Sequence, residues 1–305
     1  MPPRFDLQSH STHSDGTLTA AEVVERAGQA GVELLALTDH DTVDGVSEAL
    51  RAGQRHGVRV IPAIEISALD LSSAGQPSTG DGRELHILGY LIDHTSRALS
   101  ERLQEFLADR EQRTMRMAGA LRELGLELDE RALLARRAAG RPIGRPHLAE
   151  AVLACPANAP RLRAEQIDDI GSLIRAYLID GRPAFRTRAT PTVAEAVAAI
   201  HDGGGVAIWA HPFWDIAEPA EVLANVERLC SLSSDGGAKA SIDGVEAFYI
   251  THTREQTELL VDRCAELGLL TTGSADFHGP ENRLFSRFLA FDTYGLEPNL
   301  GPIAA

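Results

Sequence analysis

Six short apolar, strand-like runs in this chain of 305 residues carry, or lead into, side chains that can bind a metal ion. In parallel α/β barrels the active site lies at the carboxyl ends of the strands, so residues in such places meet at one rim. Six runs that bring His, Asp or Glu to the same rim predict a hydrolytic site with several metal ions. The eight candidates are His10, Asp15, His40, Glu65, His86, His211, Asp276 and His278.

This mixture of imidazole and carboxylate is typical of sites for Zn, Mn or Fe, and the carboxylates favour the harder ions. Two or three ions about 3.5–4 Å apart can clamp phosphoryl oxygens and acidify a water molecule, so no protein nucleophile is needed. Glu65 is the best bridging candidate, because a carboxylate can span two ions and an imidazole cannot.

Strand and helix patterns alternate through the first 95 residues, which indicates parallel βα units. Thr19-Ala20-Ala21-Glu22 has the spacing of a capping box and predicts a helix start. A second helix is expected over 44–56, and a polar Gly/Ser/Pro loop over 72–83. The βα pattern returns with a helix at 192–202 and strands at 242–250 and 268–274.

The middle of the chain differs from both ends. It is rich in Arg, Leu, Ala and Glu, with helical periodicity at 98–124 and near 164–180. We therefore expect a discontinuous barrel domain of residues 1–96 and 184–295, with a helical insertion of residues 97–183 that caps the active site.

Composition limits the classes of function. A net charge of −15 repels long polyanions, which favours a small phosphorylated substrate or the end of a short strand over duplex nucleic acid. No apolar run is long enough for a membrane span, and no signal peptide is recognised. Three scattered cysteines, Cys155, Cys230 and Cys264, indicate reduced thiols in a cytoplasmic protein. No obligatory protein partner is expected.

Taken together, these motifs resemble the PHP (polymerase and histidinol phosphatase) family, from Asp6 to about Asp292. Within it, the insertion and Gly144-Arg145-Pro146-His147 resemble the branch of the nucleoside 3′,5′-bisphosphate phosphatases and 5′→3′ exoribonucleases. The resemblance implies an α/β fold, a distorted (β/α)7 barrel with a helical cap. The motifs in family order are Ser14-Asp15-Gly16, Leu37-Thr38-Asp39-His40-Asp41, Glu65, His86-Ile87-Leu88-Gly89-Tyr90, Ala210-His211-Pro212 and Ser274-Ala275-Asp276-Phe277-His278.

The resemblance also implies two to three divalent ions. His10, Glu65 and Asp276 would hold the first ion. Glu65, His86 and His211 would hold the second, and Asp15, His40 and His278 the third.

One position departs from the family pattern. The family opens with His-x-His, whereas this chain has Gln8-Ser9-His10. We expect Gln8 to be a weak ligand of the first ion, with Mg²⁺ possible there, or the site to be completed by His13. Asp39 and Asp41, which flank His40, are expected to orient ligands rather than to bind metal.

The substrate is expected to meet residues outside the metal set. Arg145 could hold a phosphate by bidentate hydrogen bonds, with His147 assisting, although both could belong to an ordinary polar loop. His252 is a further candidate for the pocket. Phe213 and Trp214 could stack on a base or pack in the core.

The expected activity is that of a hydrolase acting on a phosphomonoester, in which a metal-bound hydroxide removes the 3′-phosphate of a nucleoside 3′,5′-bisphosphate. The residues expected to act in catalysis are Glu65, Asp15, His40 and Arg145. One alternative is a 5′→3′ exonuclease on short 5′-phosphorylated oligonucleotides. A degenerate, noncatalytic nucleotide-binding module and a histidinol phosphate phosphatase are further alternatives.

Overall fold

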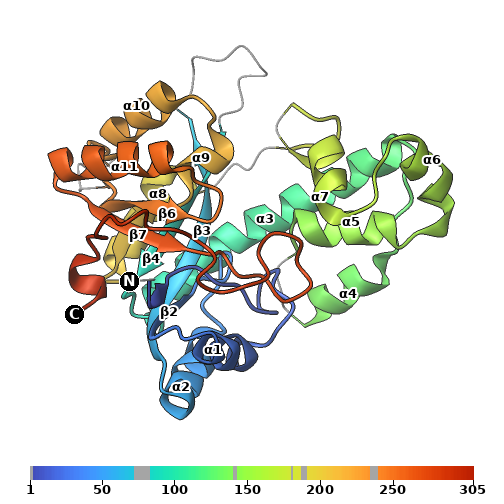
Figure 1. Ribbon diagram of the computed structural model, residues 1–305. Coiled ribbons are helices and arrows are strands. Elements are labelled where there is room, and N and C mark those ends of the chain that lie inside the picture. Colours follow the sequence, from blue (N-terminus) through green and yellow to red (C-terminus); the bar gives the residue numbers. More distant parts are fainter. Residues whose placement is uncertain (1–2, 72–82, 140–142, 180, 187–190, 234–239) are drawn as a thin grey trace. The chain divides into compact units, whose positions relative to one another are not determined.

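The computed structural model describes residues 3–71, 83–139, 143–179, 181–186, 191–233 and 240–305 and contains one seven-stranded sheet (Figure 1). The strands follow one another around this sheet in chain order. They are β1 (Phe5–Asp6), β2 (Leu34–Leu37), β3 (Arg59–Asp70), β4 (Arg83–Tyr90), β5 (Val206–Trp209), β6 (Gly244–Tyr249) and β7 (Leu270–Ser274).

The sheet is almost closed into a barrel. Beyond β1, the amide of Leu7 donates to the carbonyl of Gly273 at 3.1 Å, and the amide of His10 donates to that of Phe277 at 2.8 Å. A parallel bridge joins Ser9 to Phe277. The segments that follow β1 and β7 therefore lie side by side, which confirms the expected seven-stranded α/β barrel.

Strand direction differs from the expectation in one place. β1 to β3 run parallel, and so do β5 to β7, but β4 pairs antiparallel with β5. A parallel strand after β3 would need a crossover, usually a helix, and residues 71–82 are too rich in Gly, Ser and Pro to favour one. His86 therefore reaches the rim from near the start of its strand, not from the end.

β3 is also longer than the run that was expected to end at Glu65. It continues through Asp70, and residues 63–70 are all buried. Glu65 consequently lies inside a strand whose backbone is held on both sides, and not on a strand-end loop. The expected polar loop at 72–83 lies outside the described residues except for Arg83.

The structure divides into two compact units. Unit 1 comprises 1–68, 85–103 and 191–305, and unit 2 comprises 69–84 and 104–190. The helices of unit 1 are α1 (Ala20–Gln29), α2 (Val46–His56), α8 (Val193–Asp202), α9 (Pro212–Asp215), α10 (Pro219–Leu229), α11 (Arg254–Leu267) and the short 3₁₀ helix η3 (Gly301–Ile303).

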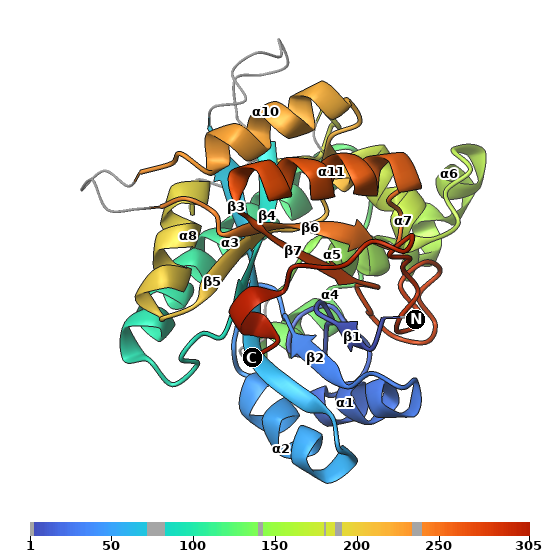
Figure 2. The same ribbon diagram turned by 60° about the vertical axis from the view of Figure 1, so that its left-hand side comes forward.

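Local sequence accounts for these helices. The capping box at Thr19 is present: its side chain accepts from the Glu22 amide, and the Glu22 carboxylate accepts from the Thr19 amide. The apolar positions of α1 and α2 pack with β2 in one buried cluster that includes Val23, Ala49 and Leu35. Figure 2 shows α11 along β6 and β7, with α10 beside α11, so helices cover the outside of this part of the barrel.

Unit 2 is helical and has its own core. Its elements begin with the greater part of α3 (Arg97–Glu123), which confirms the helix expected at 98–124. Near 164–180 the chain is helical only in part, because residues 165–169 are not helical. The remaining elements are α4 (Glu130–Ala138), α5 (Arg145–Leu153), η1 (Pro156–Asn158), α6 (Ala159–Ala164), α7 (Ile170–Leu173) and the π-helix η2 (Ile174–Leu178).

Leu121, Leu148 and Leu173 lie at the centre of the core of unit 2. Among the described residues no helix is both long and apolar enough to cross a membrane. Within the described part of the chain, Cys155, Cys230 and Cys264 form no disulfide.

Candidate metal centre

Glu65 lies at the centre of the site, fully buried and surrounded by imidazoles. Its Oε1 lies 2.6 Å from His86 Nδ1 and 3.4 Å from His211 Nε2. Its Oε2 lies 3.1 Å from His10 Nε2 and 3.7 Å from His40 Nδ1. Both oxygens therefore face candidate ligands, as a bridging carboxylate requires.

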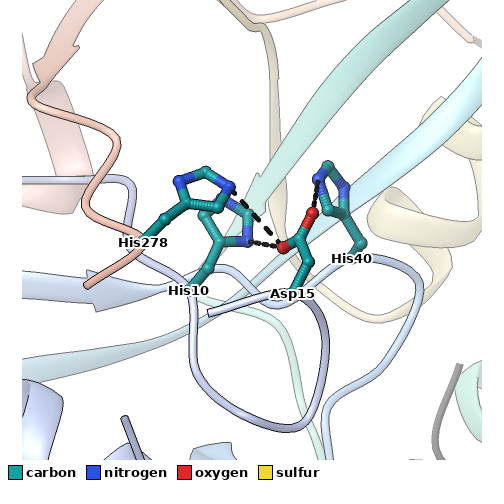
Figure 3. A group of neighbouring side chains, drawn as sticks. All are labelled: His10, Asp15, His40 and His278. Carbon is teal, nitrogen blue, oxygen red and sulfur yellow. Dashed lines mark ion pairs between the residues drawn. The ribbon is translucent and has the colours of Figure 1, made fainter. Parts of the chain in front are cut away.

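Asp15 organises a second group, shown in Figure 3. Its Oδ1 lies 3.6 Å from His10 Nδ1 and 3.5 Å from His278 Nε2. Its Oδ2 lies 3.7 Å from His40 Nε2. These residues follow three different strands, β1, β2 and β7, so the closure of the barrel brings them together.

Asp276 completes a third group. Its Oδ1 lies 3.1 Å from His10 Nε2 and 3.6 Å from His278 Nδ1. Its Oδ2 accepts a 2.8 Å hydrogen bond from the hydroxyl of Tyr249. One oxygen therefore faces the site while the other is held by the barrel wall.

In each of three groups of side chains, every residue offers one possible ligand atom that lies within 4.8 Å of those of the other members. One group matches the set implied for the first ion, and another joins His10 to the set implied for the third. The third group contains His40 in place of His211, which lies beside Glu65 but outside the groups. The groups are His10-Glu65-Asp276, His10-Asp15-His40-His278 and His40-Glu65-His86.

The donor atoms fit divalent cations. His10 Nε2 and Asp276 Oδ1 are buried and make no well-aligned hydrogen bond to another described residue, although they lie 3.1 Å apart. A buried polar atom without a partner costs about 1–3 kcal/mol, and native proteins rarely tolerate several in one place. Cations between these atoms would satisfy them.

The charges of the centre depend on one another. Burial alone would raise the pKa of Glu65, but the neighbouring His40, His86, His10 and His211 hold it well below its usual range. Burial alone would lower the pKa of His10, but Asp276 and Glu65 raise it well above the usual value. The neighbouring imidazoles thus keep Glu65 ionised by placing positive charge beside it, a role that metal ions can take over.

Two aspartates support the ligands. Asp39 accepts from the amide and the hydroxyl of Ser11 and from the hydroxyl of Ser14, which holds the loop carrying Asp15. Asp41 accepts from the Ser67 amide at 3.0 Å. Neither aspartate belongs to any of the three groups, in agreement with an orienting role.

His13 lies apart from the candidate ligands. Its Nε2 is 4.0 Å from Glu48, its side chain is 26% exposed, and no group found among the described residues includes it. The structure therefore offers no support for completion of the first site by His13.

Glu246, on β6, was missed in the sequence. It is fully buried, and accepts from the His211 amide at 3.0 Å and from the Ser274 hydroxyl at 2.6 Å. Burial raises its pKa to about 8, with a smaller contribution from Asp276. A single acidic residue between Val245 and Ala247 was the available indication, since a charge inside an apolar strand needs partners.

Backbone conformation marks the same region. His211 and Asp276 have positive φ values of 29° and 53°, and Asp41 has 56°. Side chains other than Gly cost about 1–3 kcal/mol in such conformations, which persist where the surroundings impose them. The hydrogen bond from the His211 amide to Glu246 is one such constraint.

An aromatic group borders the centre. The ring of Tyr249 lies 5.2 Å from that of His211 and 6.4 Å from that of Trp214. The ring of Phe285 lies 5.3 Å from that of His278 and 5.6 Å from that of Trp214. Trp214 is 50% exposed, so this group presents an aromatic surface next to the candidate ligands.

His252 packs behind this surface. It is 3% exposed, its Nδ1 donates to the Ala247 carbonyl at 3.0 Å, and burial lowers its pKa to about 4. It is therefore a neutral imidazole, and its ring lies 5.4 Å from those of Phe213 and Tyr249.

Arg145 and His147 lie in unit 2, at the start of α5. Arg145 Nη2 donates to Glu84 at 2.9 Å, and Glu84 also pairs with the buried Arg113. His147 Nδ1 accepts from the Gly144 amide at 3.0 Å and so caps the helix. Their role in binding a phosphate stays a prediction.

Removal of Glu65 should be the most damaging single change to metal binding, because two groups lose a shared carboxylate. Elemental analysis of protein purified without chelator should find at least about two divalent ions per chain, and far fewer in Glu65→Ala. Glu33→Ala, at an exposed ion pair with Arg4, is the control. Less than about 0.3 ions per wild-type chain, with no binding of added Mn²⁺, would contradict the metal centre.

Glu246 should make the metal-free protein less stable as pH rises. Its folded pKa of about 8 exceeds the ordinary value of 4.5, so the native state binds more protons between these values and loses stability up to pH 8. In Glu246→Gln, the fall in unfolding free energy between pH 5 and 8 should be smaller by at least about 1 kcal/mol. Chemical denaturation in the presence of chelator measures this. Asp6, whose pKa burial raises to about 7, is present in both proteins, so identical pH profiles would refute the assignment to Glu246.

Comparison with known proteins identifies the family of this chain. The family model for the PHP domain matches residues 6–140. A 5′-3′ exoribonuclease of Haemophilus influenzae is 30% identical, with 92% of each chain covered. A phosphoribosyl 1,2-cyclic phosphate 1,2-diphosphodiesterase of Eggerthella lenta is 33% identical, covering 92% of this chain and 95% of the relative. A 3′,5′-nucleoside bisphosphate phosphatase of Chromobacterium violaceum is 30% identical, covering 90% and 87%.

Among solved structures, that of an amidohydrolase from Chromobacterium violaceum with bound sulfate superimposes with a TM-score of 0.75. It is 26% identical, and the match covers 99% of this chain and 93% of the other. The likeness therefore extends over both the barrel and the helical unit. With relatives at 30% identity or more over nine tenths of its length, the chain belongs to the PHP-domain family of metal-dependent phosphoesterases.

Proposed function

We propose that this protein removes the 3′-phosphate from a nucleoside 3′,5′-bisphosphate. The observation that carries the proposal is the half-exposed Trp214 beside the candidate metal centre. The metal centre could bind the phosphate of a nucleotide, and the ring of Trp214 could stack on its base. The relative named as a 3′,5′-nucleoside bisphosphate phosphatase supports this choice.

Divalent ions, when bound, supply Lewis-acid polarisation of the phosphoryl group and acidify water. The side chains of this protein would hold these ions and orient them toward the phosphate. Glu65 presents one oxygen to His86 and the other to His10, so a single carboxylate can serve two ions. Asp15 and His40, whose Oδ2 and Nε2 lie 3.7 Å apart, would contribute to a neighbouring ion. These residues would act in the reaction by fixing the positions of the divalent ions that contact the phosphate.

Tyr249 fixes the orientation of the Asp276 carboxylate. Its hydroxyl donates to one oxygen of Asp276, which leaves the other oxygen directed to His10. The same ring separates Asp276 and His211 from the exposed Trp214. Tyr249 therefore links the part of the site that meets the phosphate to the part that meets the base.

Arg145 and His147 complete the proposal as residues that bind a phosphate. A guanidinium has five N–H donors in a planar fork, and one of its nitrogens is engaged by Glu84. Such a fork matches the oxygens of a phosphate.

A second candidate function is a 5′→3′ exonuclease on short 5′-phosphorylated oligonucleotides, favoured by the relative named as an exoribonuclease. The relative that acts on a phosphoribosyl cyclic phosphate adds a third phosphoester of ribose. The net charge of −15 favours the smallest substrates, since a polyanion is repelled along its length. Retention of eight ligand-type positions opposes a noncatalytic module.

A substrate panel tests these functions against one another. Manganese-loaded protein should release inorganic phosphate from adenosine 3′,5′-bisphosphate. The kcat/KM of this reaction should be at least about tenfold higher than the kcat/KM for each of two other substrates, a difference of about 1.4 kcal/mol. The others are a 5′-phosphorylated trinucleotide and ribose 1,2-cyclic phosphate 5-phosphate. Faster release of mononucleotides from the trinucleotide would favour the exonuclease, and faster ring opening would favour the cyclic phosphodiesterase. Glu65→Ala is the inactive control.

Trp214→Ala should raise the KM for adenosine 3′,5′-bisphosphate about 5- to 100-fold, because stacking of a base on an aromatic ring contributes about 1–3 kcal/mol. Its kcat should change little, since Trp214 contacts the candidate ligand His211 through its backbone amide, which donates to the His211 carbonyl and is kept in the alanine variant. Trp214→Phe should keep most of the affinity. Hydrolysis of a phosphomonoester without a base, such as methyl phosphate, should be unaffected by either change. An equal loss on both substrates would show that Trp214 supports the metal centre instead of the base.

A further inference from the structure

Gln8 stands where the family pattern has a histidine ligand, but its side chain is occupied on both sides. It is 1% exposed. Its Nε2 donates to Glu65 Oε2 at 2.9 Å. Its Oε1 lies 3.3 Å from the hydroxyl of Ser274, whose single proton is shared between this oxygen and Glu246 Oε1 at 2.6 Å. The amide is therefore a link between two buried residues.

Chemistry decides which way the amide faces. The two ends of an amide look alike in shape, so hydrogen bonding determines the assignment. An ionised carboxylate only accepts, so the Gln8 nitrogen must face Glu65, and the oxygen must face the other way. Only the oxygen could bind a cation, and it faces Ser274 instead of the shared oxygen of Glu65.

We propose that Gln8 is a positioning residue for Glu65 and not a metal ligand. A carboxylate oxygen has two lone-pair directions, and the Gln8 N–H takes one of those on Glu65 Oε2. The other remains for an ion between His10 and Asp276. The first site of this chain thus has three protein ligands, His10, Glu65 and Asp276, which form one of the three groups above.

The link continues beyond Gln8. The hydroxyl of Ser274 is also 2.6 Å from Glu246 Oε1, and Glu246 Oε2 accepts from the His211 amide. A buried chain of hydrogen bonds therefore runs from the backbone of His211 to Glu65. It crosses the barrel through residues of β6, of β7 and of the segment after β1. The position of the central carboxylate is thereby tied to that of a candidate ligand on another strand.

This inference rests on the metal-dependent activity proposed above but not on the identity of the substrate. Its tests use metal alone, so a failure of the substrate panel leaves them intact. They follow bound Mn²⁺ by its anomalous X-ray signal and its affinity by calorimetry.

A crystal structure of the wild-type protein with Mn²⁺ gives the direct test. We expect an ion bound by His10, Glu65 and Asp276, with Gln8 Nε2 still within hydrogen-bond distance of Glu65. An ion about 2.0–2.2 Å from Gln8 Oε1 would overturn the proposal, because that is a coordination distance for oxygen.

A double-mutant cycle tests the link itself. Ser274→Ala should weaken Mn²⁺ binding about 3- to 10-fold in the wild-type protein but less than about 2-fold in a Gln8→Leu background, since the link is already broken there. In a Gln8→His background, where imidazole can bind the ion directly, Ser274→Ala should likewise have little effect. Equal effects of Ser274→Ala in all three backgrounds would overturn the proposal.

Controls separate this link from general damage. Ser231→Ala removes an exposed hydroxyl on the same unit and should leave Mn²⁺ binding unchanged. The melting temperature of each metal-free variant shows whether it is folded. If Gln8→Leu does not fold, comparison of the wild-type and Gln8→His backgrounds still decides the question, because only the former should respond to Ser274→Ala.

Discussion

The site depends on one buried carboxylate surrounded by imidazoles. Moving a carboxylate out of water is unfavourable unless opposite charge and hydrogen-bond donors replace the lost hydration. Around Glu65 this replacement comes from His10, His40, His86 and His211, which lower its pKa against the effect of burial. Such a cluster places many acceptor atoms in a small volume. Bound cations would interact with several of these atoms at once. The buried charges of this centre therefore favour the binding of metal ions.

The barrel explains how residues separated by more than 250 positions in the chain can share one ion. Closure between the segments after β1 and β7 places His10 beside Asp276 and His278. The reversed strand β4 does not disturb this convergence, because His86 lies near its start and β5 delivers His211 at its end. What the centre requires is that each strand have one end at the rim. The direction of an individual strand matters less than the position of its ligand along it.

Sequence reasoning succeeded where the chemistry was local to a strand end. Candidate ligands such as His40 and Asp276 follow apolar runs, and the capping box at Thr19 marks a helix start. It failed where pairing decides the structure. The direction of β4 depends on its neighbours, and so does the continuation of β3 beyond Glu65. Glu246 could be noticed as an acidic residue in an apolar strand, but its partners, Ser274 and the His211 amide, lie on other strands. The aromatic surface of Trp214 and Phe285 likewise joins segments about 70 residues apart.

Gln8 shows why a ligand position need not keep its ligand. Loss of an imidazole from a multi-metal centre would leave Glu65 with one fewer fixed neighbour and an unsatisfied lone pair. The Gln8 amide does not replace the lost metal ligand, but its N–H donates to the lone pair of Glu65. Its oxygen is held by Ser274. The cost is one ligand at one ion, whereas the geometry of the carboxylate shared with the other ions is preserved. The orientation of Glu65, a carboxylate that can serve more than one ion, is therefore maintained even though residue 8 itself does not coordinate an ion.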